Sequence, residues 1–463
     1  MSHENCSHRL AAPLSRKDFL KLTGMSLGTL ALGTMFADSL LAADAPTVMP
    51  LNLLPRDPPL PAKAKHVIHI FAGGAPSHLD TFDYKPSMDR FRDKTVNGLS
   101  GVIWPSPFTF EACGRGGVQI SELFPNLRTV ADDLCVIRSM NSEIPAHGPA
   151  SQLLHTGSAI LTKPSLGSWV LYGLGTESQN LPGFVSLGGA PEARQAAFLP
   201  GIYQGSQADF RANAPTNKVL PNLTSEFSSL DQQRAQLDLA ATLDAQHQKT
   251  VQADEQLEAR IGSFELAFRM QTAATDAFDI TKESEATRTA YGTTDLGARL
   301  LCARRLVERG VRFVQIDAGG WDHHDNLATS IRRTSASIDQ PAAALIKDLK
   351  ARGLLDETLV IWGGEFGRTP NTPGHVSETS GRDHWSNAFC CWMAGGGVRG
   401  GMMHGETDDL GREVVKDPVH IHDLHATILR LLGFDHTKLT YRYNGRDFRL
   451  TDNYGKIVNQ IIA

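Results

Sequence analysis

The chain has 463 residues, of which 41% are hydrophobic, and a formal net charge of −5 at pH 7. This composition allows a large buried core, and the small net charge without any Lys/Arg block argues against nucleic acid as a partner. The six cysteines show no C-x-x-C spacing, so a zinc–thiolate site is not expected.

The first 45 residues have the order of a cleavable export signal. The segment Ser15–Lys21 precedes an uncharged apolar run, Leu22–Ala37, and a small-residue site, Ala43–Ala45. It resembles the S-R-R-x-F-L-K motif of twin-arginine signals, with Lys17 in place of the second arginine. The alternative is a membrane anchor, but the run is shorter than the ~20 residues that a spanning helix needs. We therefore expect cleavage of the signal, 1–45, no stable membrane span afterwards, and a periplasmic or cell-envelope protein.

Residues 46–62 are rich in proline and are expected to form an extended linker. A single domain, 63–463, is predicted to follow. Within it, 226–290 is charged, rich in alanine and nearly free of Gly and Pro, which predicts an insertion of two or three helices. This insertion could be a lid, a dimer surface or a scaffold over one sheet edge.

Apolar runs and helical periodicities alternate along the rest of the domain. This alternation is the pattern of βαβ units, so we predict an α/β fold with a doubly wound, mostly parallel sheet. The predicted strands are 66–71, 134–138, 311–317, 359–362 and 389–392, and the predicted helices are about 149–157, 294–308, 338–352 and 423–432.

Five loops next to predicted strands carry Asp, Glu or His. In open α/β sheets, ligands bind at the carboxyl ends of the strands, so these side chains are expected to meet. Carboxylate and imidazole ligands without cysteine suit zinc, manganese or iron, and magnesium or calcium where oxygen ligands dominate. The loops contain Ser77, His78 and Asp80; His147; Asp322 to Asn326; Glu365; and Asp383 with His384.

The order of these motifs resembles the alkaline phosphatase-like superfamily. More closely, the chain resembles a family of exported, sulfatase-like bacterial proteins of unknown function in that superfamily. The resemblance covers about residues 64–455. Its motifs are HIFAGGAPSHLDTFDYKP, GVRFVQIDAGGWDHHDN, TLVIWGGEFGRTP, GRDHW and DLHATILRLLGF.

The resemblance implies a metal site, with several departures from the enzymes' pattern. Ala72 falls where the first-strand Asp belongs, Asn326 and Phe366 each replace a histidine, and His147 falls at the position of the Ser, Thr or Cys nucleophile. The metal ligands that we expect are His78 or Asp80, Asp322, His324 (with His323 as an alternative), Glu365 and His384.

The other candidates lie beside these ligands. His147 is expected to be a metal ligand or a nucleophile, and Asp383 an orienting partner. Arg368 and Arg382 could hold an oxyanion, with a structural role for Arg368 equally open. Ser151 is the hydroxyl nearest to His147 in the chain, although a plain role in the first turn of the helix is favoured.

Two functions remain open at this point. The first is an exported, metal-dependent hydrolase acting on a phosphate or sulfate ester of a small molecule or a glycan. The second is a non-catalytic exported binding or envelope protein that keeps the fold after losing the nucleophile.

Overall fold

The computed structural model describes residues 52–212, 219, 229–248 and 255–463. The predicted export signal and most of the first half of the proline-rich linker lie outside the described residues. One compact unit extends from Met49 to Ala463. Within the described residues, no helix has both the length and the apolar character that crossing a membrane requires.

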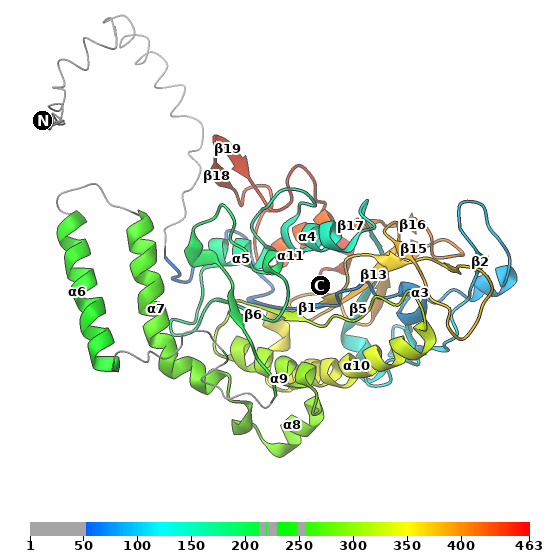
Figure 1. The fold of residues 1–463 in the computed structure, drawn as a ribbon, viewed down its shortest axis with the longest axis horizontal. Coiled ribbons are helices and arrows are strands. Elements are labelled where there is room, and N and C mark those ends of the chain that lie inside the picture. The colour runs from blue at the N-terminus through cyan, green and yellow to red at the C-terminus, as the bar shows by residue number, and fades with distance from the viewer. Residues whose placement is uncertain (1–51, 213–218, 220–228, 249–254) are drawn as a thin grey trace, which may run out of the picture. The chain divides into compact units, whose positions relative to one another are not determined.

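A nine-stranded sheet forms the centre of this unit (Figure 1). Its strand order is β14-β5-β13-β9-β1-β8-β6-β7, with β17 also paired to β5. β13 pairs antiparallel with both β9 and β5, whereas the other pairs in the sheet are parallel. The strands are β1 (His66–Phe71), β5 (Leu134–Asn141), β6 (Phe184–Leu187), β7 (Ser206–Ala208), β8 (Phe313–Asp317), β9 (Thr358–Gly363), β13 (Phe389–Ala394), β14 (Met402–His404) and β17 (Val419–His420).

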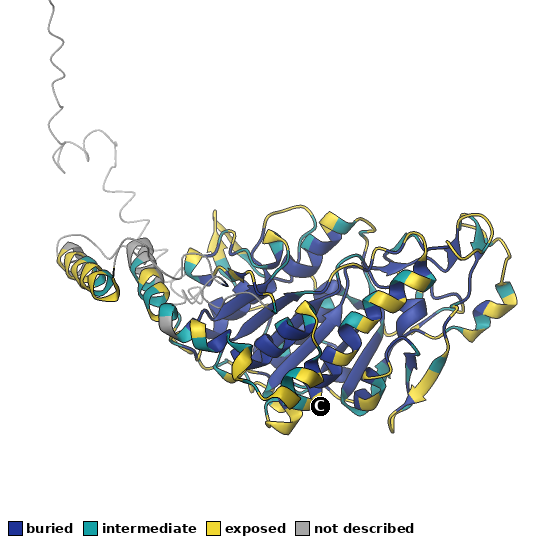
Figure 2. Cartoon of the chain, turned by 60° about the horizontal axis from the view of Figure 1, so that its bottom comes forward, coloured by how far each residue is buried: buried dark blue, intermediate teal, exposed yellow. Residues whose placement is uncertain are grey.

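Helices cover both faces of the sheet (Figure 1). Because successive side chains of a strand point to opposite faces, β1 places Ile68 and Ile70 in one core and Val67 and Phe71 in the other. The first core includes α9 (Asp295–Glu308) and α10 (Leu327–Ala351), and the second includes α4 (His147–Thr156), α5 (Leu166–Leu174) and α11 (Ile421–Leu431). Figure 2 shows the buried strands between these layers. The predicted doubly wound, mostly parallel α/β architecture is confirmed.

Most predicted elements differ from the structure only at their ends, and α10 differs most. It begins at Leu327 instead of 338 and contains Pro341. In its first half the buried positions are Leu327, Ile331, Ser335 and Ile338, a stripe with helical spacing in which Ser335 interrupts the apolar signal.

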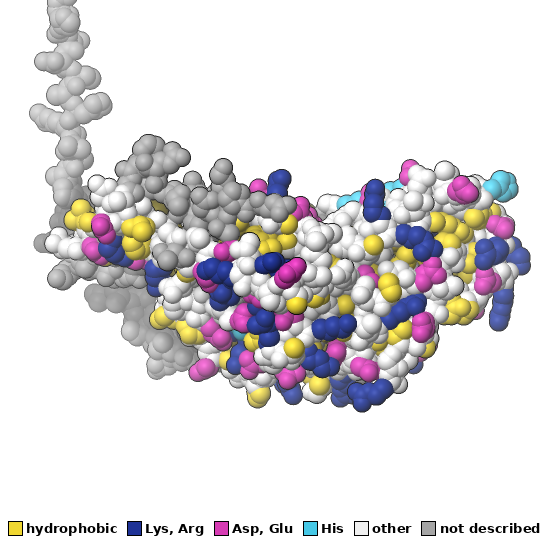
Figure 3. Space-filling model, turned by 90° about the horizontal axis from the view of Figure 1, so that it is seen from below, with side chains coloured by type: hydrophobic (Ala, Val, Ile, Leu, Met, Phe, Trp, Pro, Cys, Tyr) yellow, Lys and Arg dark blue, Asp and Glu magenta, His cyan; other side chains and the backbone are white. Residues whose placement is uncertain are grey.

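The described part of the stretch 226–290 contains α6 (Leu230–Gln248), α7 (Glu255–Ala277) and all but the last residue of α8 (Glu285–Tyr291). α6 lies along α7, where Arg234 donates hydrogen bonds to both carboxylate oxygens of Glu265 at 2.9 and 2.5 Å. On the face shown in Figure 3, Lys/Arg and Asp/Glu side chains are interspersed. Short elements complete the described fold: α3 (His78–Thr81), and the pairs β2 (Val102–Ile103) with β11 (Asn371–Thr372), β3 (Phe110–Cys113) with β4 (Val118–Ser121), β10 (Gly367–Arg368) with β12 (His384–Trp385), β15 (Glu406–Thr407) with β16 (Val414–Lys416), and β18 (Tyr441–Tyr443) with β19 (Arg446–Phe448).

Candidate metal centre

Five neighbouring strands deliver polar loops to one edge of the sheet. The registers place the ends of β1, β8 and β9 together, since Phe71 pairs with both Asp317 and Gly363. β13 runs in the opposite direction, so its first residues, not its last, lie at this edge, where Phe389 pairs with Met140 near the end of β5. The loops after β1, β5, β8 and β9 and the loop before β13 therefore meet, as predicted.

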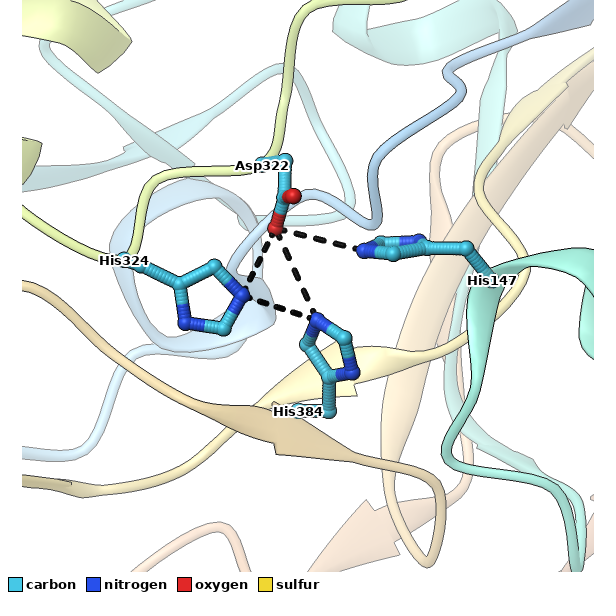
Figure 4. A group of neighbouring side chains, drawn as sticks. All are labelled: His147, Asp322, His324 and His384. Atoms are coloured by element: carbon cyan, nitrogen blue, oxygen red, sulfur yellow. Dashed lines mark hydrogen bonds and ion pairs between the residues drawn. The ribbon is translucent and has the colours of Figure 1, made fainter.

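Four side chains from three of these loops converge at one point (Figure 4). They are His147, at the start of α4, Asp322 and His324, which follow β8, and His384, in β12. Asp322 Oδ1 lies 3.0 Å from Nε2 of His324, 3.2 Å from Nε2 of His147 and 3.6 Å from Nε2 of His384. The Nε2 atoms of His324 and His384 are 2.9 Å apart.

Local structure holds each of these residues in place. β12 pairs with β10, so that His384 lies opposite Arg368. Asp322 follows Trp321, whose buried indole donates a hydrogen bond to the carbonyl of Ala318 at 2.9 Å. The turn after β1 approaches this segment closely: a Cβ on Gly74 (φ 99°) would lie 2.6 Å from the backbone nitrogen of Asp322, so this position needs glycine.

The outer ring nitrogen of each histidine has an acceptor. His147 Nδ1 lies 2.7 Å from Glu365 Oε1, His324 Nδ1 lies 3.1 Å from Asp383 Oδ1, and His384 Nδ1 lies 2.9 Å from the Pro145 carbonyl. Carboxylates and carbonyls only accept hydrogen bonds, so each neutral ring carries its proton on Nδ1. The lone pairs of the three Nε2 atoms are therefore free to bind a metal.

The residues present fit a divalent metal ion. Metal-bound histidines generally donate the other ring N–H to a carboxylate or a carbonyl, and that is the arrangement of all three rings here. Ligand atoms at 2.0–2.1 Å around a tetrahedral zinc ion are about 3.3 Å apart, close to the distances from Asp322 Oδ1 to the three Nε2 atoms. Moreover, among the described residues the buried Nε2 of His147 has no hydrogen-bond donor or well-aligned partner, although Asp322 Oδ1 lies 3.2 Å away. Three nitrogens and one carboxylate oxygen suit zinc, manganese or iron better than calcium, which prefers oxygen ligands.

Charged neighbours shift the ionisation of the cluster. Partial burial opposes ionisation of Asp322, but Arg368 Nη2, 2.6 Å from Oδ1, and the nearby histidines lower the pKa of this carboxyl to about 2. The hydrogen bond to Glu365 raises the pKa of His147. Burial lowers the pKa of His384. Asp322 is therefore ionised throughout the physiological range of pH.

Two predicted residues lie directly outside the cluster and support it. Glu365 is buried, and its Oε1 accepts hydrogen bonds from His147 and, at 3.0 Å, from the backbone N–H of Gly74, while Oε2 has no hydrogen-bond partner. Asp383 Oδ1 accepts a 3.1 Å hydrogen bond from Nδ1 of His324, a contact that an orienting partner would make.

The structure does not bring His78 and Asp80 into the cluster. Asp80 is fully buried and pairs with Arg382, whose Nε lies 2.8 Å from Oδ2. Burial opposes its ionisation, but Arg382 lowers the pKa of Asp80. His78 is also buried, and its Nε2 lies 2.8 Å from the carbonyl of Gly411. Arg382 therefore fixes the loop before β12 to α3 through Asp80 and does not face the cluster.

Sequence reasoning gave no role to the Phe366 ring or to the Pro145 carbonyl. Of the two adjacent histidines, His324 joins the cluster, whereas His323 is buried and its pKa is lowered to about 4 by that burial. Phe366 packs its ring against His147 and His384, with centroids 4.9 and 4.7 Å apart. The role of the Pro145 carbonyl could not be inferred from residue type, because a backbone group makes the contact to His384. Its position two residues before His147 was the one available indication.

A shallow pocket of about 330 Å³ opens beside the cluster. Glu192, also missed from the sequence, reaches it from the short helix η3 (Pro191–Ala193), which packs on α4, and its Oε1 accepts a 3.3 Å hydrogen bond from Ser151. The pocket is lined by Phe71, Gly73, Gly74, His147, Gly148, Ser151, Glu192, Asp322 and Glu365.

Residues 64–462 match the model of the family described as protein of unknown function (DUF1501). The chain belongs to the DUF1501 family. This match confirms the expected membership of a family of unknown function. A search of curated proteins found no match for this DUF1501 protein.

Solved structures with a similar chain trace have low sequence identity. They include the PsFucS1 sulfatase from Pseudoalteromonas sp. (14% identity, TM-score 0.36, 92% of this chain and 80% of that chain) and the alkaline phosphatase from the Antarctic bacterium TAB5 (11%, 0.30, 74% and 95%). A third is the lipoteichoic acid synthase LtaP from Listeria monocytogenes (10%, 0.34, 84% and 75%). With TM-scores of this size, the functional argument for the DUF1501 protein rests on its own site.

Proposed function

We propose that this protein is an exported, metal-dependent hydrolase of phosphate or sulfate esters. One observation carries the proposal: three histidine Nε2 atoms and Asp322 Oδ1 converge, while the Nδ1 atom of each ring is held by an acceptor. The motifs that resemble sulfatases and phosphatases, and the signal-like segment 1–45, support the type of reaction and the export.

The geometry favours His147 as a ligand over His147 as a nucleophile. Its Nε2 faces Asp322 and its Nδ1 is engaged by Glu365. Bound at these atoms, a divalent metal would polarise an ester oxygen and lower the pKa of a water molecule. Asp383 and Glu365 would keep the rings oriented, and Arg368 would hold Asp322 ionised and in place.

Elemental analysis of the mature protein, purified without chelator or affinity metal, tests the proposal. We expect about one equivalent of zinc, manganese or iron and its loss in His384→Ala, with a fold retained by circular dichroism. His375, which is exposed and outside the cluster, provides the matched control, since His375→Ala should keep the metal. No metal in the wild-type protein, even after reconstitution, would overturn the proposal.

A second candidate function is a metal-holding binding protein without turnover. The observation that favours it is that the position of the usual hydroxyl or thiol nucleophile holds His147, whose Nδ1 is engaged by Glu365 and whose Nε2 faces Asp322. A metal-loaded protein that binds ester analogues but hydrolyses none of a panel of phosphate and sulfate esters would establish this second function.

A further inference from the structure

We propose that the pocket beside the metal centre binds a primary ammonium group, so that the protein acts on esters whose alcohol carries an amine. This inference rests on the proposed function and names its substrate class. It follows from three features of the pocket: two carboxylates without a Lys or Arg partner, acceptors that are not grouped as metal ligands, and a lining with little aromatic surface.

Two carboxylates that line the pocket, those of Glu192 and Glu365, form no ion pair with a lysine or arginine of the described residues. The Glu365 side chain is 2% exposed. Its Oε1 accepts hydrogen bonds from His147 and from the N–H of Gly74, whereas Oε2 has no partner among the described residues. The Glu192 carboxylate accepts one hydrogen bond from the described part of the chain, at 3.3 Å from Ser151. Because a carboxylate oxygen that is buried without a donor is unfavourable, the pocket favours a ligand that donates hydrogen bonds.

The charges of the site are divided between two sides of the His147 ring. On the Nε2 side, Asp322 is paired with Arg368 at 2.6 Å and would hold the metal, so a divalent ion leaves this side positive and attracts the ester oxygens. On the Nδ1 side lies Glu365, and Glu192 lines the same pocket. The two glutamates balance the metal, so the site is neutral as a whole but polarised. A ligand that carries both an anionic ester and a cation matches this division.

These acceptors fit an ammonium group better than a second metal ion. Neither Glu192 nor Glu365 belongs to the one group of described side chains whose ligand atoms are close enough together to hold a metal, namely His147, Asp322, His324 and His384. An ammonium group contacts its acceptors at about 2.8 Å, and therefore spans more widely spaced acceptors than a metal ion with ligands at about 2.0–2.2 Å. Its N–H donors match the acceptors Glu192, Glu365 and the Ser151 hydroxyl, which donates to Glu192 and can still accept.

The lining also favours a primary over a quaternary ammonium. A quaternary cation donates no hydrogen bond and is recognised by cages of aromatic rings. Phe71 is the one Phe, Tyr or Trp that lines the pocket, and it is 9% exposed. Three glycines, at 73, 74 and 148, complete the lining and leave a volume of about 330 Å³, which suits a small amino alcohol or an amino sugar.

Two phosphonates of the same shape test binding without turnover. In 2-aminoethylphosphonate an ammonium group replaces the methyl group of n-propylphosphonate, and an alkylamine with a pKa of about 10.4 is protonated at pH 8. By calorimetry at pH 8, with and without zinc, we expect the aminoethyl compound to bind about tenfold more tightly, the effect of a hydrogen bond between charged groups. Glu192→Gln should bring this ratio close to one, and Glu285→Gln, at an exposed position on α8, should leave it unchanged. Glu365 is not used for this test, because it also orients His147.

Turnover by zinc-loaded protein provides a second readout. We expect kcat/KM for 2-aminoethyl p-nitrophenyl phosphate to exceed that for n-propyl p-nitrophenyl phosphate about tenfold, and the corresponding choline ester to lack this advantage. Glucosamine 6-sulfate, compared with glucose 6-sulfate, distinguishes an amino sugar from an amino alcohol as the source of the amine.

Equal or tighter binding of n-propylphosphonate would overturn the inference, as would a preference for the choline ester over the aminoethyl ester. A second equivalent of metal that is lost in Glu192→Gln would also overturn it, since a metal ion would then occupy the pocket. Failure of the proposed function is a different result: no ester is hydrolysed after loading with zinc, manganese or iron, yet the calorimetric ratio still decides whether the pocket binds an amine.

Discussion

The two nitrogens of His147 lie beside two carboxylates: Nε2 is 3.2 Å from Asp322 Oδ1, at the point where a metal would bind, and Nδ1 is 2.7 Å from Glu365 Oε1. Each half of the ring depends on the other, because the acceptor at Nδ1 fixes the tautomer that frees Nε2. Glu365 was predicted as a ligand, and the structure places it one step further from the cluster.

Replacing Glu365 by Gln should change His147 in a defined direction. The Glu365 hydrogen bond raises the pKa of His147, so in the metal-free variant this pKa should fall toward 6.5, as followed by NMR titration. Zinc affinity at pH 8 should drop about 10- to 100-fold, the usual effect of losing such a partner.

Asp383→Asn is the matched control at this scale. It should weaken zinc binding through His324 and leave the pKa of His147 unchanged. An unaltered His147 titration in Glu365→Gln would contradict the role assigned to Glu365.

At the scale of elements, α4 carries His147 at its first turn and ends at Gly157, which has a left-handed φ of 68°. A Cβ at Gly157 would lie 2.0 Å from the Leu450 carbonyl oxygen. Gly353 has the same φ of +68° with nothing within 4 Å of its Cβ position. Comparing alanine substitutions at Gly157 and Gly353 therefore separates the free-energy cost of the left-handed backbone from that of the close contact with Leu450.

We expect Gly353→Ala to lower the free energy of unfolding by about 1 kcal/mol, the cost of a left-handed residue with a side chain. Gly157→Ala should lower it by at least about 1 kcal/mol more, because the chain around Leu450 must shift. Urea denaturation measures the unfolding free energy of both variants. Equal losses of unfolding free energy would show that the chain around Leu450 shifts at no measurable cost.

The Asp80–Arg382 pair belongs to the same scale, because it ties α3 to the loop that carries His384. Asp80→Asn leaves a buried guanidinium uncompensated and should cost about 3–5 kcal/mol. The lowered pKa of Asp80 means that this stabilisation is present above the carboxyl's ordinary pKa of 3.8 and is lost as pH falls below it. Zinc content, measured on the folded variant, should stay at one equivalent; its loss from a folded variant would restore Asp80 as a ligand.

Element identity was readable from the sequence where apolar runs were continuous, as in 66–71 and 359–362. The direction of a strand in the sheet could not be predicted in this way, because an apolar run looks the same for a parallel and an antiparallel strand. The antiparallel direction of β13 was therefore not predicted. Likewise, the loops of the site were predictable because they follow strands. The contacts between side chains of these loops could not be predicted. Asp80 pairs with Arg382 from a distant segment, and Glu192 reaches the pocket from η3.

For the whole molecule, buried histidines should set its response to acid. Burial lowers the pKa of His69 to about 4 and that of His425 to about 3, and holds the pKa of His155 well below 6.5. In the unfolded chain these groups titrate near 6.5. The stability that they contribute is therefore complete above that pH and declines as pH falls toward 4.

We expect the metal-free protein to lose about 2 kcal/mol of unfolding free energy per such histidine between pH 8 and pH 5. Replacing His69 by Phe should reduce the number of protons taken up on unfolding by about one. The loss of unfolding free energy between the two pH values, measured by urea denaturation, should then be smaller. Metal-free protein is used so that release of a bound ion does not contribute. A variant with the wild-type pH dependence would show that His69 takes up a proton without unfolding.

The reversed direction of β13 has a consequence for how this protein can change. The segment from Gly364 to Ala388 leaves the sheet at β9 and re-enters at its immediate neighbour, on the same edge, without a crossover helix. It carries Glu365, Arg368, Asp383 and His384 as one cassette with both ends anchored on adjacent strands. Such a cassette can be lengthened, shortened or exchanged between relatives while the sheet keeps its connections, so new specificity can arise here without a new fold.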